Sequence, residues 1–222
     1  MLIYSINKIV LSIQKNPHSL LNGITSNTME AESNAFLSIH GRIVATFDQV
    51  QVNDDQMLIA LERHCYDDIK AHMQRYIMLS GVQVEETTYH VYFDLDDSYV
   101  IKENEYSVKQ KKGKLVFTKD KLDAQVTDDE FTLFRVKNAI ALQGVDYNNE
   151  MVLNVSTGDF VSFTKGCYLG QEPVSKVYNR AKPSRRLEVK RMDDCTDEEK
   201  NKMTSVCSEG GVKHGFVFVK NV

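Results

Sequence analysis

The sequence has no tryptophan, only three prolines and only four cysteines. No two cysteines stand in CxxC spacing, so we expect no permanent metal or cluster site built by local sequence. The pattern is also unlike that of a disulfide-stabilised secreted domain, so we expect no disulfides. No apolar run approaches the ~20 residues that span a bilayer. The apolar stretch at residues 1–10 lacks the features of a secretory signal and is typical of a strand.

Charge is balanced, with 27 basic and 31 acidic residues and a net charge of −4. This balance gives no global electrostatic case for binding nucleic acid or an anionic membrane. Apolar residues make up 42% of the chain and charged residues 26%, as in soluble globular proteins. The length fits one large domain or two smaller ones.

Periodicity predicts antiparallel strands that alternate with a few helices, which is an α+β fold. Strands are expected at residues 9–13, 35–39, 43–52 and 57–61, with a hairpin turn at His40-Gly41-Arg42. Helices are expected over residues 66–79 and 128–139, the second with Thr127 and Glu130 in capping-box spacing. A short helix should begin at Pro17 after the N-cap Asn16 and stop at Gly23.

The segment 182–222 differs from the main body, residues 1–181. It predicts a strand at 185–190, a polar helix or loop at 196–203, and a final strand at 212–219 that Gly215 interrupts. Because roughly forty residues cannot form a large independent core, we expect this segment to dock onto the main body. Within that body, Lys111-Lys112-Gly113-Lys114 is expected to be a solvated basic turn.

The most informative stretch is Lys165-Gly166-Cys167-Tyr168-Leu169-Gly170-Gln171-Glu172. A cysteine reacts as the thiolate, which nearby cations and helix N-termini favour. Lys165 could supply the cation, and a helix over residues 169–179 with Pro173 in its first turn would place Cys167 ahead of its N-terminus. A lone cysteine is usually a small buried hydrophobe. The surrounding Lys, Gly, Gln and Glu favour a functional thiol instead.

This stretch resembles the K-G-C-[FY]-x-G-Q-E signature of the YgfZ family, which shares ancestry with the aminomethyltransferase T-protein of glycine cleavage. Other segments resemble the same family over roughly residues 2–190: Leu20 to Asn27, Gly41-Arg42-Ile43, Phe134 to Tyr147, and Val161 to Thr164. Thr28 stands where many relatives have Asp, and the C-terminal β-barrel of the family is shortened here.

The resemblance implies two intertwined α+β subdomains, with ferredoxin-like topology, in residues 1–181 and a shortened β-barrel-like segment in 182–222. It implies tetrahydrofolate or a derivative as ligand, and a monomer that supports assembly or repair of iron–sulfur proteins, and so indirectly tRNA modification. The partners would be iron–sulfur client or assembly proteins, in the bacterial cytoplasm or the mitochondrial matrix. Cys167 would be the reactive thiol or a transient cluster ligand, with Lys165 beside it.

The expected folate contacts are Asn27, Arg135, Tyr168, Gln171 and Glu172. Tyr168 would stack on the pterin ring, and Arg135 would pair with the folate carboxylate. The alternatives are a tyrosine at the edge of the core and a surface salt bridge for Arg135. Two other functions remain open: an enzyme that transfers aminomethyl or other one-carbon groups, and a scaffold that binds a protein partner without folate.

Overall fold

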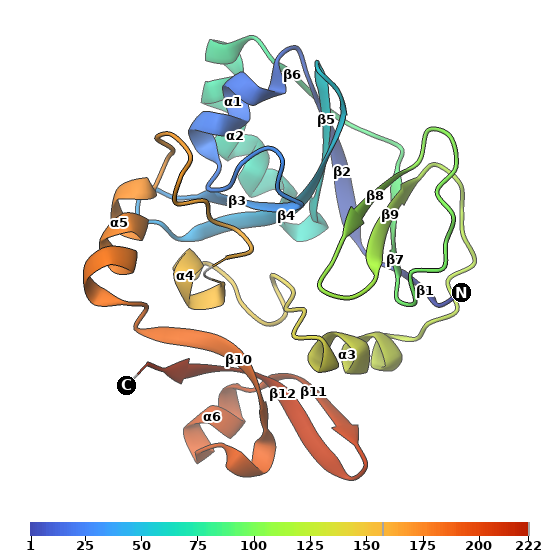
Figure 1. Cartoon of the computed structure of the whole chain (residues 1–222), viewed down its shortest axis with the longest axis vertical. Coiled ribbons are helices and arrows are strands. Elements are labelled where there is room, and N and C mark those ends of the chain that lie inside the picture. The colour runs from blue at the N-terminus through green and yellow to red at the C-terminus, as the bar shows by residue number, and fades with distance from the viewer. Residues whose placement is uncertain (157, 222) are drawn as a thin grey trace.

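Three antiparallel sheets form the molecule (Figure 1), a computed structural model that describes residues 1–156 and 158–221. The strand orders are β3-β4-β5-β2-β6, β1-β7-β9-β8 and β10-β12-β11. The strands are β1 (Ile3–Ser5), β2 (Lys8–Gln14), β3 (Ser33–Leu37), β4 (Ile43–Asn53), β5 (Gln56–Glu62), β6 (Gln83–Glu86), β7 (His90–Asp94), β8 (Tyr106–Lys109), β9 (Lys114–Thr118), β10 (Arg185–Arg191), β11 (Thr204–Glu209) and β12 (Val212–Lys220). The α-helices are α1 (Pro17–Ile24), α2 (Tyr66–Ser80), α3 (Asp128–Lys137), α4 (Val152–Val155), α5 (Gln171–Lys176) and α6 (Asp197–Lys202).

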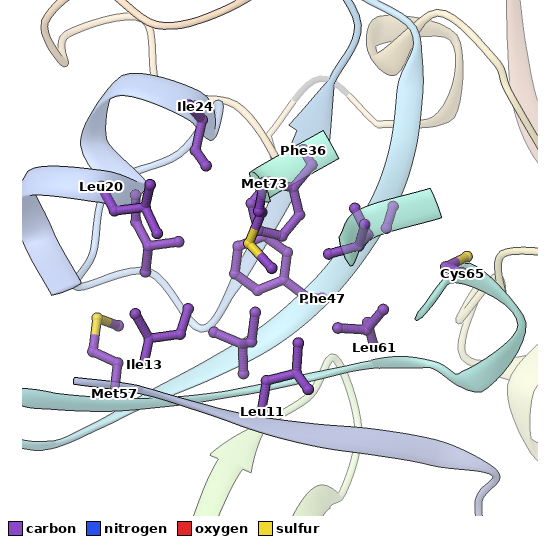
Figure 2. Close-up of a cluster of buried hydrophobic side chains, with 14 of the residues drawn as sticks. Leu11, Ile13, Leu20, Ile24, Phe36, Phe47, Met57, Leu61, Cys65 and Met73 are labelled. Atoms are coloured by element: carbon purple, nitrogen blue, oxygen red, sulfur yellow. The ribbon is translucent and has the colours of Figure 1, made fainter. Parts of the chain in front are cut away.

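Helices α1 and α2 cover one face of the five-stranded sheet and bury a hydrophobic cluster (Figure 2). Ile9, Leu11 and Ile13 of β2 point into this cluster, whereas Val10 packs in a second cluster on the opposite face. Successive side chains of a strand point to opposite faces, so β2 is buried on both sides. That double burial explains why its sequence alternates imperfectly between apolar and polar residues.

The four-stranded sheet and α3 close that second face. The rings of Tyr4 and Phe131 stack with centroids 3.9 Å apart and so join β1 to α3. The chain enters through β1 in this sheet, passes to β2 in the five-stranded sheet, and returns to the four-stranded sheet at β7. The two sheets are therefore built from interleaved segments.

The three-stranded sheet packs beneath α3 and α4, at the lower end of Figure 1. The expected capping boxes are present at both Thr127 and Thr196. Gly215 lies inside the continuous strand β12 and does not interrupt it, contrary to expectation. A Cβ atom at Gly215 would lie 2.6 Å from the Thr204 carbonyl oxygen, so the glycine permits the close approach of β12 to the start of β11.

Most predicted elements are confirmed, including the hairpin of β3 and β4, the helices α2 and α3, and the Asn16 side chain that caps α1. The fold is α+β with antiparallel sheets, as predicted. Gly23 does not end α1, which continues to Ile24 and is followed by Thr25 at the C-cap. Strand β11 was not predicted. Within the described ranges, no helix has both the length and the apolar character to cross a membrane.

Candidate functional site

The segment that carries the cysteine lies against the end of α1. The Ser162 amide donates to the Ser26 carbonyl, and the Leu169 amide donates to the Gly23 carbonyl, both at 2.9 Å. The Ser26 hydroxyl donates to the Phe160 carbonyl at 2.7 Å. These bonds anchor both ends of residues 161–170, which we call the signature loop, to the end of α1 and the turn after it.

The Lys165 side chain turns back toward that turn. Its ammonium donates to the carbonyls of Thr25 at 2.8 Å and Asn27 at 2.7 Å. It also lies 5.4 Å from the centre of the Tyr168 ring. Burial lowers the pKa of Lys165 to about 8, while the Glu30 carboxylate acts in the opposite direction. The sequence suggested that the Lys165 ammonium could serve the Cys167 thiol. Its hydrogen bonds go to two backbone carbonyls instead, so Lys165 supports the signature loop.

Cys167 is exposed on the signature loop. Helix α5 begins at Gln171 with Gly170 at its N-cap, two residues later than the predicted helical start. Pro173 lies in the first turn, as predicted, and the chain continues from α5 into the π-helical turn Val177–Ala181. Because α5 has only six residues and starts four positions after the thiol, we derive no helix-dipole effect on Cys167.

The two glycines of the signature differ. Gly170 has φ +82°, and a Cβ atom there would lie 2.4 Å from the Ser38 carbonyl oxygen in the hairpin of β3 and β4. Across this contact Gly41 has φ +70°, and its Cβ would lie 3.0 Å from Val174 of α5. Gly166 has no atom within 4 Å of such a Cβ position. Only the second glycine is therefore required by packing.

The residues that follow the cysteine do not converge on a cavity. Tyr168 is buried among Leu37, Ile43 and Val174, and this burial raises the pKa of its hydroxyl to about 12. Gln171 is half-buried and Glu172 is exposed. Tyr168 thus matches the alternative of a core tyrosine, and the expected stacking on a ligand ring finds no open face here.

Arg135 is also placed differently from either expectation. It is only 3% exposed, and its guanidinium donates to the Asp146 carboxylate at 2.7 Å and to the Ile140 carbonyl at 3.0 Å. It also donates to the Ser205 hydroxyl of β11 at 2.8 Å. The pair is buried, not on the surface, and it joins α3 to the three-stranded sheet. A ligand carboxylate would have to displace Asp146 to reach it.

A cleft of about 490 Å³ opens between the three sheets. Its walls combine aromatic and apolar side chains with polar ones from distant parts of the chain. Tyr147, Phe160 and Phe216 supply rings, and Asn27, Ser33 and Gln110 supply amide and hydroxyl groups. Asn27 alone among the residues predicted for the site lines this cleft. Its amide nitrogen donates to the carbonyls of Ser33 and Asp159, at 3.0 and 3.1 Å, and so holds the wall in place.

The inner end of the cleft adjoins a cavity of about 70 Å³ with a charged floor. The Lys8 ammonium lies 3.2 Å from an Asp48 oxygen and 3.1 Å from a Glu62 oxygen. Burial lowers the pKa of Lys8, but the two carboxylates outweigh it and hold that pKa above its ordinary value. One ammonium and two carboxylates leave an excess negative charge there. Gln110 also donates to Asp48 at 2.9 Å and so links the floor to the cleft wall.

A neutral network continues this floor. The hydroxyls of Thr46 and Tyr147 lie 2.9 Å apart, and the Gln143 side-chain oxygen accepts from the Thr46 amide at 2.7 Å. Burial raises the pKa of Tyr147, so its hydroxyl stays protonated. The sequence analysis did not predict the residues of this cavity floor. One feature could have indicated them: Asp48 is a single acid inside a strand, β4, that is otherwise apolar or neutral.

Comparison with known proteins identifies the architecture. No family model matches the sequence, and no curated protein matches it. Among solved structures, glycine cleavage system aminomethyltransferase T from Bartonella henselae is similar, with a TM-score of 0.72 and 10% sequence identity over 98% of this chain and 78% of that chain. The chain has the aminomethyltransferase T fold. At this identity the likeness establishes the fold and leaves the chemistry to the residues themselves.

The described residues contain no group of three or more His, Cys, Asp or Glu side chains placed to hold a metal ion. The arrangement offers two separate features: a cleft between the sheets and an exposed thiol on a supported loop. Asn27 connects them, since it lines the cleft and its carbonyl accepts from Lys165.

Proposed function

We propose that this protein binds a reduced folate in the central cleft and acts as an accessory factor for assembly or repair of iron–sulfur proteins. The observation that carries the proposal is the cleft between the three sheets of an aminomethyltransferase T fold. The likeness of Lys165 to Glu172 to the YgfZ signature supports the cysteine-dependent part. Folate would bind in the cleft, and the thiol chemistry would take place at Cys167 on the signature loop.

The cleft has the size and the mixed lining that a small organic ligand with a ring and polar groups needs. Its volume, about 490 Å³, is in the range of sites for small organic ligands. Phe160 is half-buried in the wall and could offer a ring face for a pterin, and Gln110 and Ser33 offer hydrogen bonds for its edge. A bound reduced folate would supply a carrier for one-carbon units. The chain's own part is to hold the ring between the sheets and to exclude water from it.

Cys167 would serve a protein partner instead of the cleft. Its thiol is exposed, and the loop around it is fixed at both ends. The thiolate is the form that ligates metal or exchanges sulfur. An iron–sulfur client or assembly protein could reach such a group without entering the cleft. The cluster is here a cargo that passes through a single thiol ligand, not a resident cofactor.

The test is anaerobic calorimetric titration of the reduced protein with tetrahydrofolate. We expect saturable binding with one site per chain. Ala141 lines both the cleft and the inner cavity, so Ala141→Phe should lower the affinity at least about tenfold. The matched control is Ala71→Phe on the exposed side of α2, which should bind as the wild type does. Absence of binding to the wild type would favour the folate-less scaffold.

Catalysis is a second candidate, favoured by the likeness to an aminomethyltransferase. A glycine-cleavage assay with a lipoyl carrier protein separates the two. We expect no turnover, because the aminomethyltransferases do not carry this cysteine signature and the C-terminal segment is short here. Turnover that survives Cys167→Ser but not Ala141→Phe would establish the enzyme instead of the accessory factor.

A further inference from the structure

Positive charge gathers in one segment of the chain, which runs from the signature loop through α5 and the π-helical turn to the start of β10. Residues 160–187 contain a single acid, Glu172, and six basic residues: Lys165, Lys176, Arg180, Lys182, Arg185 and Arg186. The segment therefore carries a net charge of +5. Since the whole chain carries −4, the remainder carries −9. The near balance of the whole chain thus combines one basic segment with an acidic remainder.

Half of these cations already have partners in the fold. Lys165 donates to two backbone carbonyls, and Arg185 and Arg186 pair with Glu150 and Glu188. The other three are exposed and form no ion pair with any carboxylate in residues 1–156 and 158–221: Lys176, Arg180 and Lys182. Cations in such positions give a local positive field that attracts an anionic partner.

A pair of aromatic rings joins this basic region to the signature loop. Phe163 of the loop and Tyr178 of the π-helical turn stack with their centroids 3.8 Å apart. Although they stack, the two residues are 39% and 51% exposed. The three free cations lie within four positions of Tyr178 in sequence. Cys167 is four positions after Phe163, so chain length alone keeps their Cα atoms within about 15 Å of each other.

The tip of the β3–β4 hairpin borders the same region. Ser38 at this tip contacts Gly170 of the signature loop, and the next residue, Ile39, is 66% exposed. Figure 1 shows the hairpin tip and α5 on the same side of the molecule, away from the four-stranded sheet. Exposed aromatic and apolar side chains next to arginine are typical of protein interfaces. Neither Phe163, Tyr178 nor Ile39 lines the cleft, so this region is separate from it.

A protein segment fits this region better than a nucleic acid does. The affinity for a nucleic acid grows with the number of phosphates that basic side chains neutralise, and only three cations are free here. The charge of −9 on the remainder of the chain would also repel a long polyanion. A short acidic segment would meet the three cations alone, and an apolar side chain within it would pack against Phe163 and Tyr178.

We propose that one surface of this protein docks an acidic segment of a partner protein and brings that segment to the Cys167 thiol. This surface, the basic face, consists of Ile39, Phe163, Lys176, Tyr178, Arg180 and Lys182. The inference rests on the proposed accessory role and adds to it the chemistry that the partner must present. Because the selection is electrostatic, it weakens as the salt concentration rises.

The experiment measures thiol–disulfide exchange between Cys167 and three synthetic peptides of equal length, in a Cys207→Ser background where Cys65 and Cys195 are buried. Each peptide contains leucine, phenylalanine and one cysteine, and its remaining residues are glutamate, glutamine or lysine. The peptide cysteine is joined in a disulfide to thionitrobenzoate. The Cys167 thiolate attacks the peptide sulfur, the protein–peptide disulfide forms, and the coloured thionitrobenzoate thiolate leaves.

At low ionic strength the acidic peptide should react at least about tenfold faster than the basic peptide, and this ratio should decrease in high salt. The rate should also saturate as the concentration of the acidic peptide rises, since docking precedes exchange. Tyr178→Ser should raise the concentration at half-saturation about three- to tenfold, because it removes one ring of the stacked pair.

Charge reversal on the basic face gives the sharpest comparison. The triple variant Lys176→Glu, Arg180→Glu, Lys182→Glu should react faster with the basic peptide than with the acidic one. A protein that merely failed to fold would not show this inversion. The matched control changes the total charge equally at other exposed positions and should still react faster with the acidic peptide: Lys70→Glu, Lys121→Glu, Lys213→Glu.

Equal rates for the three peptides, or rates that rise linearly without saturation, would overturn the docking surface. Inversion in the control triple variant would also overturn it, since total charge would then decide the preference. A cysteine-free acidic peptide should slow the exchange; stronger inhibition by tRNA at an equal concentration of negative charge would assign the basic face to nucleic acid instead. These readouts do not involve folate, so a failure of the tetrahydrofolate titration would overturn the proposed function and leave the docking surface standing.

Discussion

The cleft and the signature loop carry the two parts of the proposed function, and they are built in opposite ways. The loop is one contiguous segment; its backbone hydrogen bonds go to the end of α1 and the turn after it, and Gly170 packs against the hairpin of β3 and β4. The cleft is lined by residues from Asn27 to Phe216, drawn from all three sheets. A short motif can therefore specify the loop, whereas only the complete fold can specify the cleft.

Polar groups also serve different ends in the two regions. In the loop, Lys165 uses its charge to hold backbone carbonyls. In the cleft, Lys109 and Lys111 line the wall, and Lys111 forms a partly exposed ion pair with Asp159. The lysine two positions before the signature cysteine thus supports the loop, whereas two lysines of the β8–β9 hairpin line the cleft. Four changes test this division, from the largest expected effect to the smallest.

Arg135→Met should have the largest effect on stability. It leaves the buried Asp146 carboxylate without its ionic partner and removes the bond to Ser205. Loss of one partner of a buried pair costs about 3–5 kcal/mol. Denaturant unfolding should show a decrease of that size. The three-stranded sheet supplies Phe216 to the cleft, so folate affinity should fall, while reaction of Cys167 with a thiol reagent should not change under native conditions.

Lys137→Met is the control for Arg135→Met, on the same helix. Its partner is Glu209, and both side chains are about half exposed, so the loss should stay below about 1 kcal/mol. A similar loss in both variants would mean that the buried pair does not fix the sheet to α3. The buried ion pair would then not be what holds the three-stranded sheet, and with it one wall of the cleft, in place.

Gly170→Ala should have the next largest effect. The substitution forces a side chain into a left-handed conformation and against the Ser38 carbonyl. Strain of this kind, together with a backbone clash, costs about 2–4 kcal/mol. Thermal or denaturant unfolding measures it. Gly166→Ala in the same signature meets open space and should change stability by less than about 0.5 kcal/mol. Equal losses would indicate that the loop packs differently.

Much of the fold could be predicted because its signals are local. The capping box at Thr127, the N-cap Asn16 and the hairpin at Gly41 each depend on a few adjacent residues, and each is present. Gly215 was misread because a glycine has two uses: it can end an element, or it can allow another segment to approach closely, and only the neighbouring segment decides which applies. At Gly23 no neighbouring segment comes close, and α1 runs one residue further.

The site was harder to predict for the same reason. Asn27 and the supporting role of Gly170 belong to motifs that can be recognised in sequence. Arg135 and Tyr168 belong to the same motifs, yet they are buried in the ion pair and the core cluster that hold the loops in place. The cleft residues Lys109 and Phe216 lie more than a hundred positions apart and have no local feature that marks them. Chemistry that depends on tertiary proximity leaves little trace in a single sequence.

Lys165→Met should have a smaller effect that depends on pH. Burial lowers the pKa of Lys165 to about 8 in the folded protein, below that of an unfolded lysine. Between these two values the unfolded chain binds the proton more tightly, so this group makes the folded state more stable as pH rises. The free energy of unfolding of the wild type should therefore gain about 1 kcal/mol on the variant between pH 7.5 and 9.5, after allowance for solvent screening of a partly exposed side chain.

The matched control for Lys165→Met is Lys176→Met, an exposed lysine in the last turn of α5. The difference between wild type and this control should stay constant over the same pH range. If the difference in unfolding free energy between wild type and Lys165→Met also stays constant over this pH range, the ammonium remains protonated, held by its two carbonyl partners. The lysine would still support the loop, but its charge would play no part in the pH dependence.

Cys167→Ser should have the smallest physical effect and the largest biological one. The thiol is exposed, so stability should change by less than about 0.5 kcal/mol. Folate affinity should stay within twofold of the wild type, because the cysteine does not line the cleft. In a complementation assay the same variant should lose function, whereas Cys207→Ser on β11 should retain it. Full complementation by Cys167→Ser would contradict a functional role for the thiol of the signature loop, since the cleft alone would then account for the function.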